Sequence, residues 1–319
     1  MKLRDRTMSS PPKVSVGMPV YNGERHLEEA LRSILSQTLD DLEVVISDNA
    51  STDRTEEICR DYGRTDERVR YFRMRQNVGI VENFNIVFGL SHGPYFKWAA
   101  SDDVCAAEYL MEAVSVLDRD PTVVLAWSAA VGIDENGKHV SMPAEVSDLN
   151  SPGSVFSSDP TVRFRRLLRN IWWTDGPVHG VFRSDALEAT RTLVPHHMSS
   201  DHLLLVELSL KGRFYEIPGE LFFSRVHSGK TSRQARTLRD RAALVDRRAP
   251  GKGVVGWWRM IRGYPQRIGM YIGFVLRSTL SPAQKLVCLT EVARTLASWG
   301  VLRSRQLLSG RSPWTHPPT

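Results

Sequence analysis

Two adjacent carboxylates, Asp102 and Asp103, follow the apolar stretch YFKWAAS and precede a new helical pattern. Neighbouring acids at the end of a buried strand repel each other, so their adjacency needs a physical reason. A divalent cation between the carboxylates and a pyrophosphate would remove the repulsion, because Mg²⁺ and Mn²⁺ prefer hard oxygen ligands. The alternative is that Asp102 caps the next helix and Asp103 is simply solvated. The pair alone does not separate these two interpretations.

The first 130 residues alternate between strand and helix patterns, which indicates how the two acids are positioned. Short apolar runs predict strands, and the amphipathic segments between them predict helices. The predicted strands cover 14–20, 42–49, 69–74, 95–101 and 123–131, and the predicted helices cover 23–38, 51–63 and 83–93, with Ser51 or Thr52 capping the second helix. This alternation predicts an α/β fold with an open, mostly parallel sheet flanked by helices. Ligands then bind beyond the carboxyl ends of the strands.

The residues that follow each predicted strand are therefore the candidates for a binding site. They are Pro19, Tyr21 and Asn22 after the first strand, Asp48 and Asn49 after the second, Arg75, Asn77 and Asn83 after the third, and Asp102 and Asp103 after the fourth. Neither GxGxxG nor GxxxxGK[ST] occurs, so the dinucleotide fingerprint and the P-loop are absent. Carboxylates at strand ends instead suit a ribose and base held by hydrogen bonds, with the phosphates neutralised through a metal.

Cysteine usage and hydropathy indicate where the protein works. Cys59, Cys105 and Cys288 form neither a zinc pattern nor a disulfide framework, so a reducing compartment is expected. The N-terminus lacks the apolar segment of a signal peptide, and the best membrane candidate, 268–276, is about half the required length. We expect a cytoplasmic protein whose residues 1–12 form a disordered tail.

The basic C-terminal region, residues 231–319, has a composition of its own. It carries 16 Lys and Arg against 3 Asp and Glu, a net charge of +13, whereas residues 1–230 sum to −7. Aromatic residues are interleaved with arginines here: Trp257, Trp258, Tyr264, Tyr271 and Phe274 with Arg259, Arg262, Arg267 and Arg277. The pattern predicts either an interfacial helix on anionic lipid, at the inner face of the plasma membrane, or a helical cap packed on the domain. No nucleic-acid-binding motif accompanies the charge, so nucleic acid is not an expected partner.

Four segments carry a resemblance to a known family: VSVGMPVYNGERHLEEALRSILSQT, LEVVISDNASTDRTEEIC, RQNVGIVENFN and YFKWAASDDVCAAEYL. In this order and at this spacing, residues 13–130 resemble the nucleotide-sugar half of family 2 glycosyltransferases, which have the GT-A fold. The resemblance implies an inverting enzyme that uses a nucleoside-diphosphate sugar and Mg²⁺ or Mn²⁺. Its acceptor would be a glycan or lipid-linked acceptor of the cell envelope, and residues 131–230 would form the acceptor-binding, catalytic half.

The same resemblance implies roles for the residues at the strand ends. The nucleotide-sugar pocket would contain Pro19 and Tyr21 beside the base, Asp48 bonded to the base, and Arg75 and Asn83. Asp102 would lie nearer the ribose, with Asp103 on the metal. Ser101 departs from the frequent Asp-x-Asp pattern and is a poor ligand, which leaves most of the metal contact to Asp103.

The segment MSSDHLLLVELSLKG predicts a helix capped by Ser199 or Ser200, with Asp201 in its first turn. Family 2 enzymes have a carboxylate here that deprotonates the acceptor hydroxyl, so the resemblance implies that Asp201 is the general base. His202 and Glu207 are the alternatives, and Asp201 could instead only favour the helix dipole. In FFSRVHSGKTS, the resemblance makes His227 a further metal ligand or a residue closing over the pyrophosphate, with a solvated loop histidine as the alternative.

Two other functions remain open. A nucleotidyltransferase that forms sugar nucleotides can share this sheet, but it requires a Gly-rich loop with Lys or Arg after the first strand, which PVYNGERH does not supply. A non-catalytic nucleotide-sugar binder tethered to the membrane needs no base. Asp201 therefore discriminates between a transferase and a binder.

Overall fold

The computed structural model describes residues 10–141, 155–169, 176–194, 200–227 and 254–309. The expected tail at 1–12 therefore lies mostly outside the described residues. The strands are β1 (Val14–Val20), β2 (Leu42–Asp48), β3 (Val69–Arg73), β4 (Tyr95–Trp98), β5 (Val104–Cys105), β6 (Val123–Ile133), β7 (His139–Val140), β8 (Val181–Arg183) and β9 (Arg213–Arg225). The helices are α1 (Leu27–Leu35), α2 (Thr55–Thr65), α3 (Ile80–Gly89), α4 (Tyr109–Arg119), α6 (Pro160–Arg169), α7 (Ser184–Glu188), α8 (Ser200–Ser209), α11 (Val254–Arg277) and α12 (Pro282–Ser309), with a 3₁₀ turn at Pro177–His179.

These strands form one sheet in the order β3-β2-β1-β4-β8-β6-β9-β5, with β7 beside β6. Strands β3, β2, β1 and β4 run parallel, and β1 and β2 are buried along their whole length, as expected for strands covered on both faces. The predicted α/β fold is confirmed. Strand β8 was not predicted, because it has only three residues. It lies between β4 and β6 in the sheet and pairs with both in antiparallel orientation.

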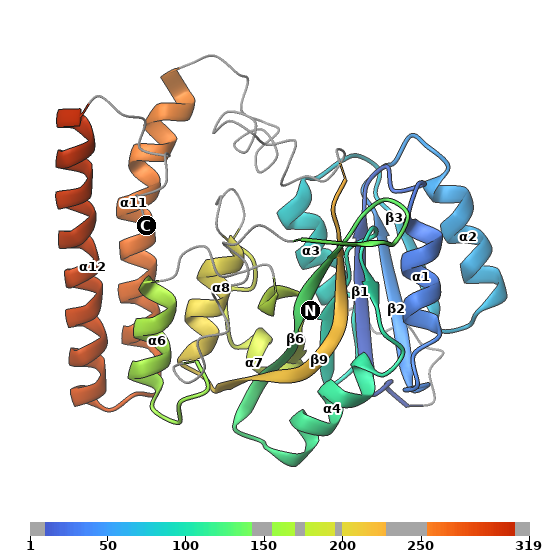
Figure 1. Ribbon diagram of the computed structural model, residues 1–319, viewed down its shortest axis with the longest axis horizontal. Coiled ribbons are helices and arrows are strands. Elements are labelled where there is room, and N and C mark those ends of the chain that lie inside the picture. Colours follow the sequence, from blue (N-terminus) through green and yellow to red (C-terminus); the bar gives the residue numbers. More distant parts are fainter. Residues whose placement is uncertain (1–9, 142–154, 170–175, 195–199, 228–253, 310–319) are drawn as a thin grey trace.

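Two hydrophobic cores lie on the two faces of the sheet (Figure 1). One face packs against α1, α2 and α4, and the predicted apolar stripe of α1 is confirmed by the burial of Leu27, Ala30, Leu31 and Ile34. The other face packs against α3 and α8, and its aromatic centre has the Trp98 ring edge-on to those of Phe96 and Phe182. The cores fix the strand ends that carry the candidate site.

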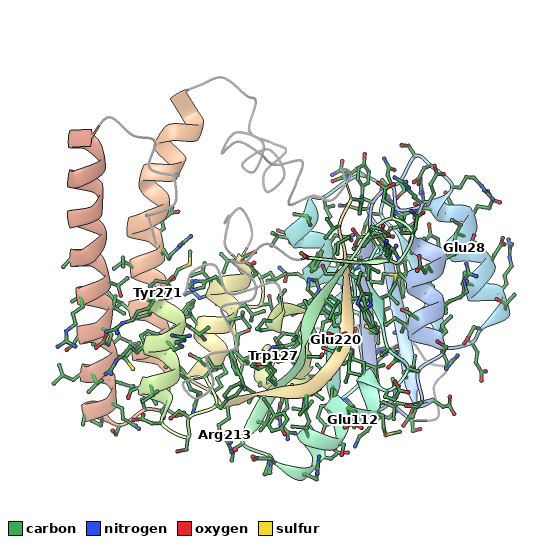
Figure 2. All side chains as sticks on the ribbon, viewed as in Figure 1. Glu28, Glu112, Trp127, Arg213, Glu220 and Tyr271 are labelled. Atoms are coloured by element: carbon green, nitrogen blue, oxygen red, sulfur yellow. The ribbon has the colours of Figure 1, made fainter. Side chains whose placement is uncertain are left out.

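Helices α11 and α12 form a hairpin in which α11 packs against α8 and α12 packs against α6 (Figure 1). The hairpin thereby covers the core that contains Trp98. Tyr271 and Phe274 are buried in that core, and Figure 2 shows Tyr271 pointing from α11 towards α8. The prediction of a helical cap packed on the domain is thus confirmed for these two aromatic residues. The side chains of residues 254–265, which include Trp257 and Trp258, are outside the part of the chain that the structure describes. Ile272 and Leu276 of the same helix are exposed. None of the described helices combines the length and the apolar character needed to cross a bilayer.

Candidate active site

The carboxyl ends of β1, β2 and β4 meet at one edge of the sheet, as the strand pattern predicts. Val20 lies opposite Asp48 in the ladder between β1 and β2, and the next N–H, of Asn49, donates to the Val20 carbonyl at 2.8 Å. On the other side of β1, the N–H of Ala99 donates to the Gly17 carbonyl at 2.9 Å, just before the turn with the two acids. This edge therefore gathers residues that are more than 80 positions apart in the sequence.

The loops after β1 and β2 are bonded to each other. Asn22 adopts a left-handed conformation, with φ of 51°, which asparagine tolerates better than most residues. Its N–H donates to Ser51 Oγ at 2.9 Å, and its Oδ1 accepts the N–H of Thr52 at 2.8 Å. The predicted cap at Ser51 or Thr52 is wrong, because α2 begins at Thr55 and both residues hold Asn22 instead. The loops after β1 and β2 thus hold each other in place at this edge.

Asp48 is fully buried at the end of β2. Its Oδ1 accepts the N–H of Ser51 at 2.8 Å, and its Oδ2 accepts the Tyr71 hydroxyl at 2.8 Å and an Arg73 N–H at 2.7 Å. Burial, and then the bond to Asp48, raise the pKa of Tyr71, so its hydroxyl remains a donor. The Arg73 side chain is 33% exposed, whereas the Asp48 carboxylate that it contacts has no exposed surface. Arg73 was not among the residues predicted from the sequence, whereas Arg75, two positions later, was.

Two asparagines hold the surroundings of Asp48. Asn83 is buried, and its Oδ1 accepts the Ser47 hydroxyl at 2.6 Å while its Nδ2 donates to the Ser47 carbonyl at 2.9 Å. Asn49 accepts the N–H of Val78 at 2.7 Å and so fixes the loop after β3. Asn83 therefore positions β2 against α3. Of the other predicted donor residues, Pro19 is buried in β1, Tyr21 is 40% exposed at its end, and Arg75 is exposed after β3.

The two adjacent acids have different surroundings. Asp102 is 22% exposed, and its Oδ2 lies 2.9 Å from Nε2 of His227, which the fold brings from the end of β9. Asp103 is buried, and its Oδ1 accepts the backbone N–H of Arg225 at 2.9 Å. Asp102 is thus the more exposed of the two acids and the one next to His227, while Asp103, the expected main metal contact, is bonded to β9.

Asp201 lies in the first turn of α8, as predicted, and its Oδ1 accepts the N–H of His202 at 2.8 Å. Helix α8 runs opposite to β9, so its first turn lies towards the carboxyl ends of the strands (Figure 1). His202 is fully buried, with Nε2 bonded to a carbonyl of α6 at 2.8 Å and Nδ1 3.3 Å from the Tyr271 hydroxyl. Glu207 is also buried and accepts a backbone N–H at 3.0 Å. His202 and Glu207 thus use their side chains to hold neighbouring segments of the fold together. Asp201 remains the candidate base.

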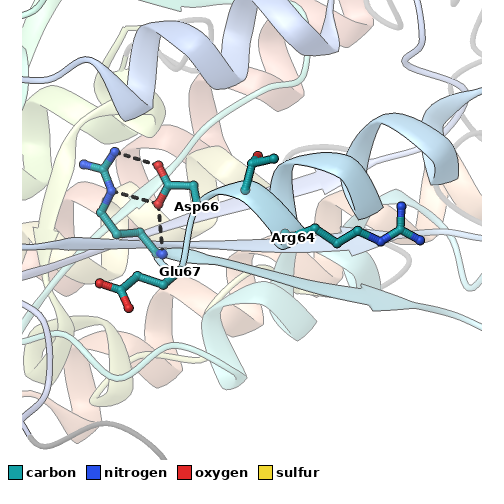
Figure 3. A pocket seen from close by; sticks show the side chains of 6 residues that line it. Arg64, Asp66 and Glu67 are labelled. Atoms are coloured by element: carbon teal, nitrogen blue, oxygen red, sulfur yellow. Dashed lines mark hydrogen bonds and ion pairs between the residues drawn. The ribbon is translucent and has the colours of Figure 1, made fainter.

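A hollow lined by residues 63–68 lies between the end of α2 and the start of β3 (Figure 3). Asp66 and Arg68 are ion-paired there at 2.8 Å. This is the amino end of β3, the edge opposite to Asp48 and the acidic turn. The hollow is therefore separate from the candidate site.

The family described as Glycosyl transferase family 2 matches residues 15–190, more than half of the 319-residue chain. This chain belongs to glycosyltransferase family 2. An uncharacterized glycosyltransferase of Haemophilus influenzae is 29% identical over 121 residues, 38% of this chain and 38% of that protein. Glycosyltransferase GlyA of Streptococcus pneumoniae is 34% identical over 98 residues, 31% of this chain and 14% of that protein. The chain thus matches well under two thirds of these relatives' length.

Solved structures extend the similarity beyond the matched segment. Residues 1–349 of S. aureus TarS, in complex with UDP-GlcNAc, superpose with a TM-score of 0.63 at 21% identity, covering 90% of this chain and 73% of that one. The mannosyltransferase PcManGT of Pyrobaculum calidifontis, in complex with GDP-Man and Mn²⁺, gives a TM-score of 0.53 at 20% identity, covering 96% and 82%. At such identities the superpositions show the fold, which is of the GT-A type.

In this family 2 glycosyltransferase, the described residues contain no group of three or more His, Cys, Asp or Glu side chains that could hold a metal ion. Asp102 and His227 offer one oxygen and one nitrogen ligand. Mg²⁺ and Mn²⁺ are commonly bound through one or two carboxylates plus substrate phosphates and water, so the pair fits a cation shared with a diphosphate. Burial, and then the charge of Arg225, lower the pKa of His26, whose ring lies 5.1 Å from that of His227. The lower pKa favours the neutral form of the His26 ring.

Proposed function

We propose that this protein is an inverting glycosyltransferase that moves a sugar from a nucleoside-diphosphate sugar to a hydroxyl of a cell-envelope glycan or glycolipid. The observation that carries the proposal is the Asp102–His227 pair at the sheet edge that also holds Asp48. TarS in complex with UDP-GlcNAc, and PcManGT in complex with GDP-Man and Mn²⁺, support a nucleotide-sugar donor and a divalent metal. Family membership also favours glycosyl transfer over the nucleotidyltransferase alternative.

On the donor side, Tyr21, Asp48 and Arg73 would hold the nucleoside, with Asp48 fixing the Arg73 guanidinium. Asp102 and His227 would hold Mg²⁺ or Mn²⁺, which when bound supplies positive charge that stabilises the diphosphate leaving group. Pro19 of β1 and Asn83, which is bonded to β2, would position these strands rather than contact the donor directly. Arg75 is exposed in the loop after β3 and would contact the donor from there.

On the acceptor side, Asp201 would accept the proton of the acceptor hydroxyl. As the hydroxyl oxygen bonds to the anomeric carbon, the bond from that carbon to the diphosphate oxygen breaks, and its electron pair leaves with the diphosphate. The proton remains on the Asp201 carboxyl group. Attack on the face opposite to the leaving group inverts the configuration at the anomeric carbon.

Donor binding tests this function directly. We would titrate UDP-, GDP- and dTDP-sugars into the protein by calorimetry, once with Mn²⁺ and once with EDTA. One nucleotide is expected to bind with Mn²⁺ and at least about tenfold more weakly with EDTA, because the diphosphate loses its cation. Absence of binding to every sugar nucleotide would exclude the function, and equal binding in EDTA would exclude the metal.

We further propose that the outer face of the α11–α12 hairpin contacts an anionic membrane on the cytoplasmic side, where a lipid-linked acceptor would lie. The hairpin exposes Ile272 and Leu276 on α11 and Leu286 on α12, and these three residues define its outer face here. Exposed large apolar residues on these two helices support a partner, and the net charge of +13 over residues 231–319 favours anionic lipid.

The double variant Leu276→Glu, Leu286→Glu is expected to bind phosphatidylglycerol vesicles about tenfold more weakly or worse, because each charge near the surface is worth about 1 kcal/mol. Co-sedimentation with vesicles measures this, with phosphatidylcholine vesicles for comparison. The matched control is Met111→Glu, Tyr215→Glu, which places the same two charges at exposed apolar residues of α4 and β9. Equal binding of the double variant and the control would contradict the proposed face.

A further inference from the structure

Arg225, the last residue of β9, is an arginine with no exposed side-chain surface. Burial of a charged group is costly unless its hydrogen bonds are satisfied. Its Nε donates to the Asp102 carbonyl at 2.9 Å, and its Nη1 donates to the carbonyls of Asp134 at 2.9 Å and Glu135 at 3.3 Å. Its Nη2 is ion-paired with Glu29 of α1 at 2.7 Å. The guanidinium thus faces three separate segments.

The backbone of the same residue adds a fourth contact, because its N–H donates to Oδ1 of Asp103 at 2.9 Å. Arg225 therefore bonds to both residues of the acidic turn, to the carbonyl of one and the carboxylate of the other. Two residues further on, His227 contacts the carboxylate of Asp102. Arg225 thereby connects the segment that carries Asp102 to the segment that carries His227. These two residues are 125 positions apart in the sequence.

We infer that Arg225 is a positioning residue that holds the acidic turn against the end of β9 and so keeps Asp102 and His227 together. This inference rests on the proposed role of that pair in binding the donor diphosphate. The guanidinium is fully buried and offers a ligand no exposed surface. It acts through Asp102 and His227, as the outer partners of metal ligands do in many sites.

The contacts require the planar guanidinium rather than a positive charge alone. Two of its nitrogens donate to different segments, Asp102 and the turn at 134–135, and the third is ion-paired with Glu29 of α1. A lysine ammonium is a point charge with donors on one atom and does not span these acceptors. The Arg225→Lys variant therefore separates positioning from simple charge neutralisation.

Arg163 provides a matched control in the same chain. It is also buried, and it likewise donates to three carbonyls, those of Ser209 at 2.8 Å, Ser157 at 2.6 Å and Ser158 at 3.0 Å. These bonds join α6 to the end of α8 and lie outside the acidic turn. Arg163→Met therefore removes a comparable set of buried bonds without touching Asp102 or His227.

The experiment compares wild type, Arg225→Met, Arg225→Lys and Arg163→Met. Calorimetry measures binding of UDP, GDP or dTDP, whichever binds the wild type, with Mn²⁺ and with EDTA. Both Arg225 variants are expected to lose about 10- to 100-fold in Mn²⁺-dependent affinity, the usual cost of losing an outer partner of a metal ligand. Their affinity in EDTA is expected to stay at the wild-type value, as are both affinities of Arg163→Met.

Amide hydrogen exchange without nucleotide gives the second readout. Arg225→Met is expected to speed exchange in residues 102–105 and 134–136, and Arg163→Met is expected to speed it near 157–163 instead. Rescue of Mn²⁺-dependent binding by Arg225→Lys, or unchanged exchange at 102–105 in Arg225→Met, overturns the inference. If the wild type binds no nucleotide, the proposed function fails, and the exchange result still decides whether Arg225 holds the turn.

Discussion

Asp201→Asn is expected to lower kcat for sugar transfer by about 10²- to 10⁴-fold, the usual contribution of a general base. The amide has the shape of the carboxylate, and its oxygen still accepts the N–H of His202, so the first turn of α8 persists. Binding of the donor with Mn²⁺ is expected to stay within about twofold of wild type, since Asp201 acts on the acceptor. Steady-state transfer kinetics and donor calorimetry on the same preparation measure both quantities.

Asp185→Asn is the matched control for this prediction. Asp185 lies in the first turn of α7, is exposed, and accepts the N–H of the next residue, Ala186, at 2.6 Å. It shares with Asp201 the favourable interaction of a carboxylate with a helix N-terminus, and it lacks a predicted role in the site. If both variants lose only a little stability and kcat is unchanged, Asp201 serves the helix dipole alone, and another group is the base.

The N-terminal half of the fold was predictable because each of its signals is local. Strands β1 and β2 are buried throughout and therefore appear as continuous apolar runs, and α1 shows its buried stripe directly in the sequence. The order of parallel strands then places their carboxyl ends at one edge. That reasoning brought Tyr21, Asp48 and Asp102 to the same place, where the structure has them.

The remainder depends on contacts between distant segments, which a sequence pattern does not contain. Arg73 is at the end of a predicted strand, and only its bond to Asp48 of the neighbouring strand indicates its importance. Strand β8 is too short for a periodic signal and is defined by its pairing with β4 and β6. The different surroundings of Asp102 and Asp103 arise from β9, more than 100 residues later.

Separate replacement of Asp102 and of Asp103 by asparagine is expected to give the second large effect. Asp102→Asn is expected to weaken Mn²⁺-dependent donor binding by about 100-fold or more, because even the outer partners of a metal ligand cost about 10- to 100-fold when removed. Asp103→Asn keeps an oxygen that accepts the N–H of Arg225, so its donor affinity is expected to stay within about threefold of wild type, with some loss of thermal stability. Calorimetry with Mn²⁺ and with EDTA, and a thermal melt, measure these effects.

The comparison is informative because the two substitutions are identical in chemistry and adjacent in the chain. Any general disturbance of the turn affects both variants, so a difference between them reports which carboxylate meets the cation. We expect this carboxylate to be Asp102, which is partly exposed and next to His227, whereas Asp103 is buried against β9. The reverse result, with binding lost in Asp103→Asn and retained in Asp102→Asn, would return the metal contact to Asp103 and leave the Asp102–His227 contact as a structural hydrogen bond.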